Sequence, residues 1–318
     1  MFEDLSRQIN EFGSSVLNAL GAVQDWIGGD LKLVNPIRTS VFKLVGNSPL
    51  IELNVLGEAY KPHKIYLKAE FLNPTGSIKD RTAISILQYE MDRGALKKNM
   101  QLELFGFGTG NLALVWAARR FGFEVVVYLE EKTNPAHVTK LRQYGATVKH
   151  LAELEFQKSF LEKQKSPKTQ SSLYLSEDTH LANPNSHFFS TGPEIFRDLA
   201  GNVDVLVCGG GSGGSLSGAG RFLKKQKPGL QCVMAATPDS QFLTKSGQLP
   251  LVFDPKIVDV YIPVTKDEGR RTQAMLYEKE GIFAGFTTGL TLMGALKFAE
   301  SLEGKEPKNI VVISPDRE

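Results

Sequence analysis

The chain has 318 residues, of which 42% are hydrophobic and 23% are charged, an ordinary composition for a globular protein. Its formal net charge is +2 and its basic residues are dispersed, which argues against nucleic acid as a partner. No apolar run reaches the length of a transmembrane helix, and no signal peptide is recognisable, so we expect a cytoplasmic protein. Cys208 and Cys232 lie in apolar runs and are interpreted as buried hydrophobic residues in a reducing compartment.

Residues 1–38 are predicted to form an amphipathic helical extension. Hydrophobic residues recur every three to four positions from Phe2 to Ile27, and the pattern stops at the sequence "GGD". The polar face is not basic, so we expect this helix to dock on the protein itself or on a second subunit instead of a membrane.

From residue 41 onward, strand-like and helix-like patterns alternate. Strands are predicted at 49–54, 64–70, 100–105, 124–131, 146–152, 204–210, 230–236 and 309–315. Amphipathic helices are predicted at 80–95, 112–122 and 135–145. The polar stretch 162–172 is expected to be exposed. Apolar strands that alternate with amphipathic helices indicate parallel β/α layers.

The stretch "NPTGSIKDR", residues 73–81, places Lys79 between a turn and an apolar helix. A cation is mildly unfavourable there, because the N-terminal end of a helix attracts negative charge. One interpretation is a solvated lysine without a role. The other is a desolvated neutral amine that forms a Schiff base with a carbonyl cofactor. Local chemistry alone leaves both open.

Residues 203–227 run from an apolar strand through a glycine-rich loop into a helix. Glycines allow close approach of the backbone, and a helix N-terminus offers free N–H groups, so this pattern predicts a phosphate site. Gly209, Gly211 and Gly214 also satisfy G-x-G-x-x-G, with Asp239 downstream, as in dinucleotide-binding proteins. The pattern alone therefore does not identify the ligand.

The lysine motif and the glycine loop together resemble the fold-type II pyridoxal-phosphate enzymes, in the cysteine synthase and cystathionine β-synthase branch. Three further stretches resemble that family: "LVGNSPLIELN" (44–54), "NPNSHFFSTGPEI" (183–195) and "EGIFAGFTTG" (280–289). The resemblance implies a two-domain α/β fold like that of the tryptophan synthase β subunit, each domain a twisted, mostly parallel sheet flanked by helices. We expect a smaller mobile domain at 39–183 and a larger cofactor-phosphate-binding domain at 184–318.

The resemblance also implies roles for single residues. Lys79 would carry the pyridoxal phosphate and later remove the substrate α-proton. Thr287, where the family usually has serine, would hydrogen-bond the pyridine nitrogen. Thr75 and Ser77 would either contact substrate or shape the turn. The cofactor phosphate would be held by Gly211, Ser212, Gly213, Gly214 and Ser215.

The chain departs from the family at "FGFGTGN", residues 105–111, where the family usually has "TSGNTG". Without gaps, Thr109 replaces the family asparagine that meets the cofactor ring; a shifted alignment puts Asn111 there instead. Gly106, Phe107 and Gly108 would line the place of the substrate carboxylate. A phenylalanine cannot hydrogen-bond a carboxylate, so we expect an atypical substrate.

The resemblance implies pyridoxal-phosphate-dependent β-replacement or β-elimination on a serine-derived amino acid, with a thiol or other nucleophile and no metal. An amino-acid dehydratase or ammonia-lyase and a catalytically quiet cofactor-binding partner protein are the alternatives. A nicotinamide oxidoreductase is disfavoured by the lysine motif. We expect a homodimer in amino-acid biosynthesis, with no nucleic-acid or membrane partner.

Overall fold

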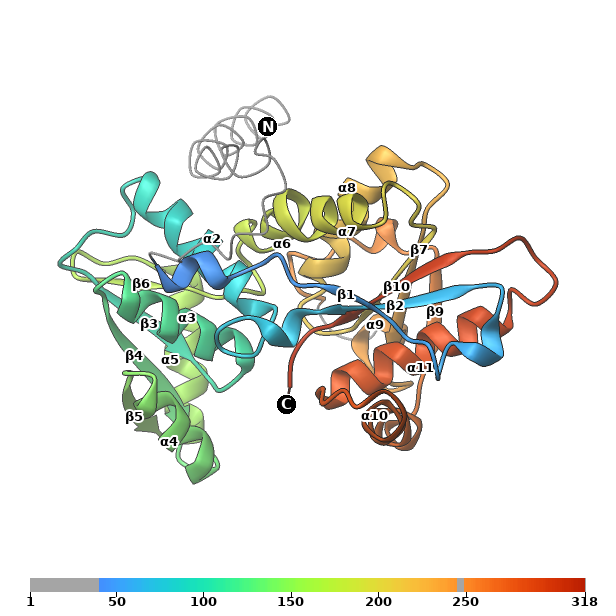
Figure 1. The fold of residues 1–318 in the computed structure, drawn as a ribbon. Helices are drawn as coiled ribbons and strands as arrows, with labels where there is room; N and C mark the ends of the chain where they lie inside the picture. Colours follow the sequence, from blue (N-terminus) through green and yellow to red (C-terminus); the bar gives the residue numbers. More distant parts are fainter. Residues whose placement is uncertain (1–39, 245–248, 318) are drawn as a thin grey trace.

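The computed structural model describes residues 40–244 and 249–317, arranged around two β-sheets (Figure 1). The helix expected at residues 1–38 lies outside the described residues.

The larger sheet has six strands in the order β1-β2-β10-β7-β8-β9. All neighbouring pairs are parallel except β1 and β2, which are antiparallel. Val311 of the central strand pairs with Tyr66 on one side and Leu206 on the other. The strands are β1 (Leu50–Glu52), β2 (Lys64–Ala69), β7 (Val205–Gly209), β8 (Gln231–Ala236), β9 (Val260–Pro263) and β10 (Asn309–Ser314).

Helices cover both faces of the larger sheet (Figure 1). Val205 and Val207 pack in one core with Leu292, whereas Leu206 and Cys208 pack in another with Leu216. Successive side chains of a strand point to opposite faces, so a strand buried on both faces is apolar throughout. The helices are α7 (Gly192–Asp198), α8 (Gly214–Gln226), α9 (Gln241–Thr244), α10 (Lys266–Glu280) and α11 (Phe286–Glu300).

The smaller sheet has four parallel strands in the order β5-β4-β3-β6. Its core is formed with α2 and α3 and includes Ile86, Leu104, Val115 and Val127. The elements are α2 (Lys79–Asp92), β3 (Gln101–Phe105), α3 (Thr109–Arg120), β4 (Glu124–Glu130), α4 (Pro135–Gln143), β5 (Thr147–Leu151), α5 (Glu153–Lys165) and β6 (Ser172–Tyr174).

Short helical segments complete the described chain. One of them, η4, has the wider π-helical spacing and links α6 to α7. The segments are η1 (Val41–Leu44), η2 (Glu58–Tyr60), η3 (Glu70–Leu72), α6 (Ala182–Ser186), η4 (His187–Thr191) and η5 (Pro255–Ile257).

The expected α/β class with mostly parallel sheets is confirmed. The predicted domain boundaries do not coincide with the sheets, however. Strands β1 and β2, which lie within 39–183, pair with β10 in the larger sheet. Such a pairing depends on contacts between segments far apart in sequence, which local periodicity does not encode.

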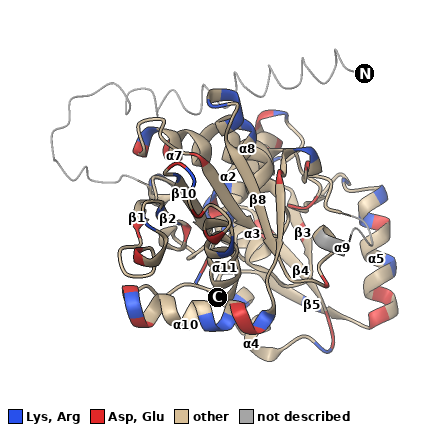
Figure 2. Cartoon of the chain, turned by 90° about the vertical axis from the view of Figure 1, so that its right-hand side faces the viewer, with Lys and Arg blue, Asp and Glu red and all other residues tan. Residues whose placement is uncertain are grey.

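Acidic and basic side chains alternate over short distances on the surface. In Figure 2, acidic and basic residues are interspersed along α5 and α10. Within residues 40–244 and 249–317, no helix is long and apolar enough to span a bilayer.

Candidate active site

Lys79 is the first residue of α2, and its side-chain nitrogen has partners from two other segments. The Nζ atom lies 2.8 Å from Glu177 Oε2 and donates to Ser212 Oγ at 3.3 Å. Ser212 belongs to the glycine loop between β7 and α8. The side chain of Lys79 is only 17% exposed. The fold therefore brings the two motifs singled out in the sequence into direct contact.

The glycine loop has the features of a phosphate cradle. Within the described chain, no acceptor pairs with the N–H groups of Gly211, Ser212 and Gly213, which precede the N-terminal end of α8. A Cβ built on Gly211 would meet nothing within 4 Å, so the space beside the loop is open. Unpaired donors at a helix N-terminus suit an anion. These residues, continued by Gly214 and Ser215, fit a cofactor phosphate.

Gly213 has a backbone conformation that requires glycine. Its φ of +77° is in the left-handed region, and a Cβ there would lie 2.5 Å from Phe253. A valine at Gly213 is therefore expected to weaken pyridoxal-phosphate binding by about 1–3 kcal/mol, as measured by titration of the apoprotein. Gly229→Ala serves as the control, because a Cβ at Gly229 meets nothing. Unchanged affinity in the valine variant would place the phosphate elsewhere.

Thr287 lies at the base of the glycine loop. Its Cγ2 atom would be 3.0 Å from a Cβ built on Gly209, the last residue of β7. Among the described residues its hydroxyl makes no hydrogen bond, whereas Thr288 is paired with Ser314 at 2.8 Å. Thr287 can therefore offer its hydroxyl to a bound ligand.

The divergent loop before α3 is held by its own asparagine. Asn111 Nδ2 donates to the carbonyl oxygens of Phe105 and Gly106, at 2.8 and 2.9 Å. The Phe107 ring stacks on His137 of α4 with a centroid separation of 3.8 Å. Thr109 begins α3, and a Cβ on Gly106 or Gly108 would meet nothing. The loop thus presents open backbone toward the site, while its aromatic side chain contacts α4.

Thr75 and Ser77 use their hydroxyls within the turn and also line a cavity. Thr75 Oγ1 donates to Asp80 Oδ1 at 2.5 Å, and Ser77 Oγ accepts from the N–H of Lys79 at 3.2 Å. A cavity of about 460 Å³ is lined by both residues together with Thr109, Lys140, Tyr144 and Asp316, among others. Turn shaping and substrate contact are therefore compatible at these positions.

Two carboxyl groups flank this turn, those of the buried Asp80 and the half-buried Asp316. Burial raises the pKa of Asp316 to about 6, against the attraction of Lys79. Its Oδ1 atom is buried without a hydrogen-bond partner in the described chain. Burial likewise raises the pKa of Asp80 to about 6, although Thr75 donates to it. Both groups can therefore change protonation near neutral pH.

A buried network of charged residues lies next to Lys79. It joins the lysine motif (73–81) to the family-like stretch 183–195. Arg81 makes two hydrogen bonds to Glu70, both 2.8 Å, and two to Glu194, both 2.7 Å. Lys68 Nζ lies 2.9 Å from Glu194. Burial alone would raise the pKa of Glu194, but the Arg81 guanidinium holds it well below the usual range. The network ties the start of α2 to α7 and β2.

Three residues around Lys79 were not predicted from the sequence: Glu177, Asn183 and Asp316. Asn183 Nδ2 donates to Ser212 Oγ at 3.2 Å. Asn183 begins the family-like stretch 183–195, so a signal for it was present. Glu177 lies in a segment without a recognisable pattern, and Asp316 directly follows the strand predicted at 309–315. Only the fold brings the two residues to Lys79.

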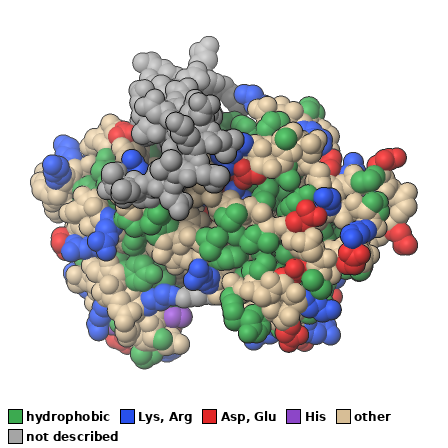
Figure 3. Space-filling view, in the orientation of Figure 1, with side chains coloured by type: hydrophobic (Ala, Val, Ile, Leu, Met, Phe, Trp, Pro, Cys, Tyr) green, Lys and Arg blue, Asp and Glu red, His purple; other side chains and the backbone are tan. Residues whose placement is uncertain are grey.

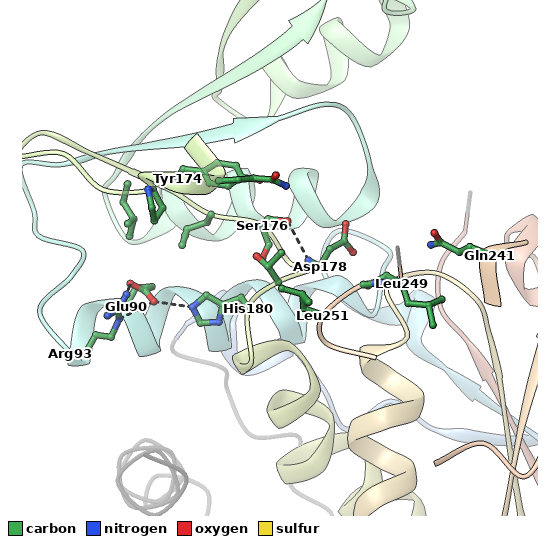
Figure 4. Close-up of a pocket in the computed structure, with 15 residues that line it drawn as sticks. Glu90, Arg93, Tyr174, Ser176, Asp178, His180, Gln241, Leu249 and Leu251 are labelled. Carbon is green, nitrogen blue, oxygen red and sulfur yellow. Dashed lines mark hydrogen bonds and ion pairs between the residues drawn. The ribbon is translucent and has the colours of Figure 1, made fainter. Parts of the chain in front are cut away.

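A second cavity, of about 580 Å³, lies beyond the segment that carries Glu177 (Figure 4). Ser176 and Asp178 line it, whereas Glu177 does not. At its far end His180 Nε2 lies 2.9 Å from Glu90. His180 Nδ1 accepts from the N–H of Ala182, so Nε2 carries the proton that Glu90 accepts. This cavity is thus separated from Lys79 by residues 176–178.

Comparison with known proteins identifies the family. The family model described as "Pyridoxal-phosphate dependent enzyme" matches residues 41–316. The chain belongs to this family. It is 31% identical over 294 residues to cysteine synthase A of Escherichia coli, covering 85% of this chain and 90% of that protein. It is 30% identical over 314 residues to cystathionine beta-synthase of Apis mellifera, covering 91% of this chain but only 60% of the bee protein.

Among solved structures, this enzyme is similar to a hydrogen sulfide-producing enzyme from Fusobacterium nucleatum. The TM-score is 0.82 at 26% identity, covering 91% of this chain and 98% of that one. The expectations of a pyridoxal-phosphate-dependent enzyme and of membership in the cysteine synthase branch are confirmed by these similarities. The nicotinamide alternative is thereby set aside, and Asp239 is an exposed residue paired with Lys266.

Proposed function

We propose that this enzyme catalyses β-replacement or β-elimination on a serine-derived amino acid, with Lys79 as the residue that carries the cofactor. One observation supports this proposal above the others. Lys79 contacts Ser212 beside the N-terminal end of α8, and Glu177, its ion-pair partner, lies against Gly110 at the N-terminal end of α3. Backbone N–H groups that are unpaired among the described residues therefore flank Lys79 at two helix N-termini. Those at α8 suit the phosphate of an aldehyde cofactor, and those at α3 suit the carboxylate of a substrate.

Each residue has a distinct task in this proposal. When bound, pyridoxal phosphate supplies an electron sink that stabilises negative charge on the substrate α-carbon. Gly211, Ser212, Gly213, Gly214 and Ser215 hold the phosphate. Thr287 donates or accepts a hydrogen bond at the pyridine nitrogen. A hydroxyl there does not favour a protonated ring as a carboxylate would, which suits elimination and replacement better than transamination.

Lys79 is the proposed base for the α-proton. Its Nζ atom is held between Glu177 and Ser212, so it is oriented toward the space between the two helix N-termini. Thr109 is the proposed contact to the ring hydroxyl, because the amide of Asn111 already donates twice within its own loop. Thr75, Ser77, Gly106, Phe107 and Gly108 are the proposed substrate-side residues.

The decisive experiment maps the covalent attachment site. The purified protein is reduced with borohydride in the presence of pyridoxal phosphate, digested, and analysed by mass spectrometry. The adduct is expected on the peptide that contains Lys79, and candidate amino acids should change the visible spectrum of the unreduced protein. An adduct on another lysine, or a spectrum indifferent to every serine-derived amino acid, would contradict the proposal.

Phe107 is proposed to set the preference among donors. The family loop supplies a hydroxyl at this position, so we expect O-acetylserine to be used poorly here. Loss of one hydrogen bond to a charged group costs about 1.5–3 kcal/mol, which is about one to two orders of magnitude in kcat/KM. Phe107→Ser is therefore expected to raise kcat/KM for O-acetylserine by about 10- to 100-fold.

The matched control is His137→Ala, which removes the stacking partner of Phe107 without adding a hydroxyl. It should leave the preference among donors unchanged. If the parent already uses O-acetylserine and sulfide quickly and Phe107→Ser brings no gain, the proposal for Phe107 is wrong. Backbone N–H groups would then bind the substrate carboxylate without a hydroxyl.

We also propose a cytoplasmic homodimer that takes a thiol or another small nucleophile. Figure 3 shows hydrophobic side chains gathered in the middle of one face of the molecule. Exposed apolar residues of the described chain include Leu72, Tyr277 and Phe283, and a covering subunit would remove such residues from water. Light scattering should give twice the mass of one chain. The buried, unpaired thiols of Cys208 and Cys232 are compatible with a reducing compartment.

A further inference from the structure

Lys79 and three polar residues around it form a closed ring of contacts. Lys79 Nζ meets Glu177 Oε2 at 2.8 Å and Ser212 Oγ at 3.3 Å. Asn183 Nδ2 completes the ring by donating to Ser212 Oγ at 3.2 Å and to the carbonyl oxygen of Glu177 at 2.8 Å. The ring fixes the direction of the Glu177 side chain, because both its backbone and its carboxylate are held.

The Glu177 carboxylate lies directly on the first turn of α3. A Cβ built on Gly110 would be 2.3 Å from Glu177 Oε1, so only glycine leaves room for this carboxylate. The side chain is 19% exposed. A negative charge at a helix N-terminus is stabilised by the helix dipole. The protein thus places a carboxylate of its own where the divergent loop ends and α3 begins.

This position matters for the substrate of the proposed reaction. The proposed donors for the substrate carboxylate are the N–H groups of Phe107 and Gly108 and those of the first turn of α3, which have no acceptor among the described residues. The N–H of Gly106 donates to the carbonyl oxygen of Tyr128 at 2.9 Å, so Gly106 contributes open space beside the loop and no donor. Glu177 already occupies the Gly110 end of that set and forms an ion pair with Lys79. An incoming amino acid must therefore bind beside this charge or displace it, at a cost that grows with its own negative charge.

We infer that Glu177 is a specificity-determining residue that competes with anionic ligands for the α3 N-terminus and for Lys79. This inference rests on the proposed function. The residue selects against donors whose β-substituent is negatively charged, such as O-phosphoserine, relative to neutral donors such as serine and O-acetylserine. The negative charge of Glu177 also opposes entry of the cofactor phosphate, because Glu177 pairs with the same lysine nitrogen that contacts Ser212 of the glycine loop.

The test compares Glu177→Gln, which keeps the shape and removes the charge, with the parent protein. The first readout is the dissociation constant of pyridoxal phosphate from the apoprotein, expected to fall about tenfold for loss of one partly buried charge near the ligand. The second is KM for O-phosphoserine, serine and O-acetylserine. The KM for O-phosphoserine is expected to fall about tenfold more than that for serine, with smaller changes in kcat.

Asp178→Asn is the matched control. It removes the same charge from the next residue, whose side chain lines the cavity of Figure 4. Lys79 attracts Asp178 only through space, whereas it forms an ion pair with Glu177. Asp178→Asn should change the logarithms of the dissociation constant and of KM by less than half of the change that Glu177→Gln causes. Equal effects of the two variants would indicate general electrostatics and overturn the assignment to Glu177.

Other outcomes also decide the question. A higher KM for all donors in Glu177→Gln would mean that Glu177 helps to hold the substrate, and unchanged constants would mean that it is inert; either result overturns the inference. Borohydride mapping of the same samples separates the two levels. If the adduct is on Lys79 and Glu177→Gln is silent, only this inference fails; if no adduct forms on Lys79, the proposed function fails.

Discussion

Lys79→Ala should lose covalent cofactor attachment entirely and lower kcat by about 10²- to 10⁴-fold, the usual contribution of a positioned general base. The reason is that Lys79 contacts the glycine loop through Ser212, and no other lysine of the described residues does so. The loss should appear as the absence of a borohydride-stable adduct in mass spectrometry and as slow turnover of serine-derived donors.

The control for this variant is Lys132→Ala. The side chain of Lys132 is 88% exposed, with a long contact of 3.8 Å to Glu153. It should retain the adduct, the spectrum and the turnover of the parent protein. A Lys79→Ala protein that still forms a reducible adduct would show that another lysine carries the cofactor.

Arg81→Met should lower the free energy of unfolding by about 3–5 kcal/mol, as expected when one partner of a buried ion network is removed. Arg81 is 5% exposed and its guanidinium faces both Glu70 and Glu194. Without it two carboxylates remain buried with only Lys68 and polar groups to compensate them. Urea denaturation followed by circular dichroism measures the change.

Arg119→Met is the matched control, because Arg119 pairs with the exposed Glu124 at the surface. Exposed pairs contribute about 0–1 kcal/mol, so the control should unfold nearly like the parent. If Arg81→Met costs no more than Arg119→Met, the network does not stabilise the fold. Arg81→Met should also bind pyridoxal phosphate more weakly than the parent protein does, because Arg81 lies two residues after Lys79 and anchors the start of α2.

Local patterns predicted most of the strands, but the helices α7, α10 and α11 were not predicted, and neither was α5 (Glu153–Lys165). Its residues are largely Glu, Lys and Gln, and Leu154 is 80% exposed, so hydrophobic periodicity is weak there. The signal that could have found it is the pair Phe156 and Phe160, four positions apart, whose rings pack around Phe105.

By itself the sequence determined the alternation of strands and helices, the glycine loop ahead of α8 and the placement of Lys79 at a helix start. These depend on backbone preferences and side-chain periodicity, which act over a few residues. Only the tertiary structure decided that β1 and β2 join β10, that Asn111 is used within its own loop, and that Glu177 reaches Lys79. Those contacts join segments that are distant in the chain, and they exist because two sheets pack their helices so that the N-termini of α3 and α8 flank one lysine.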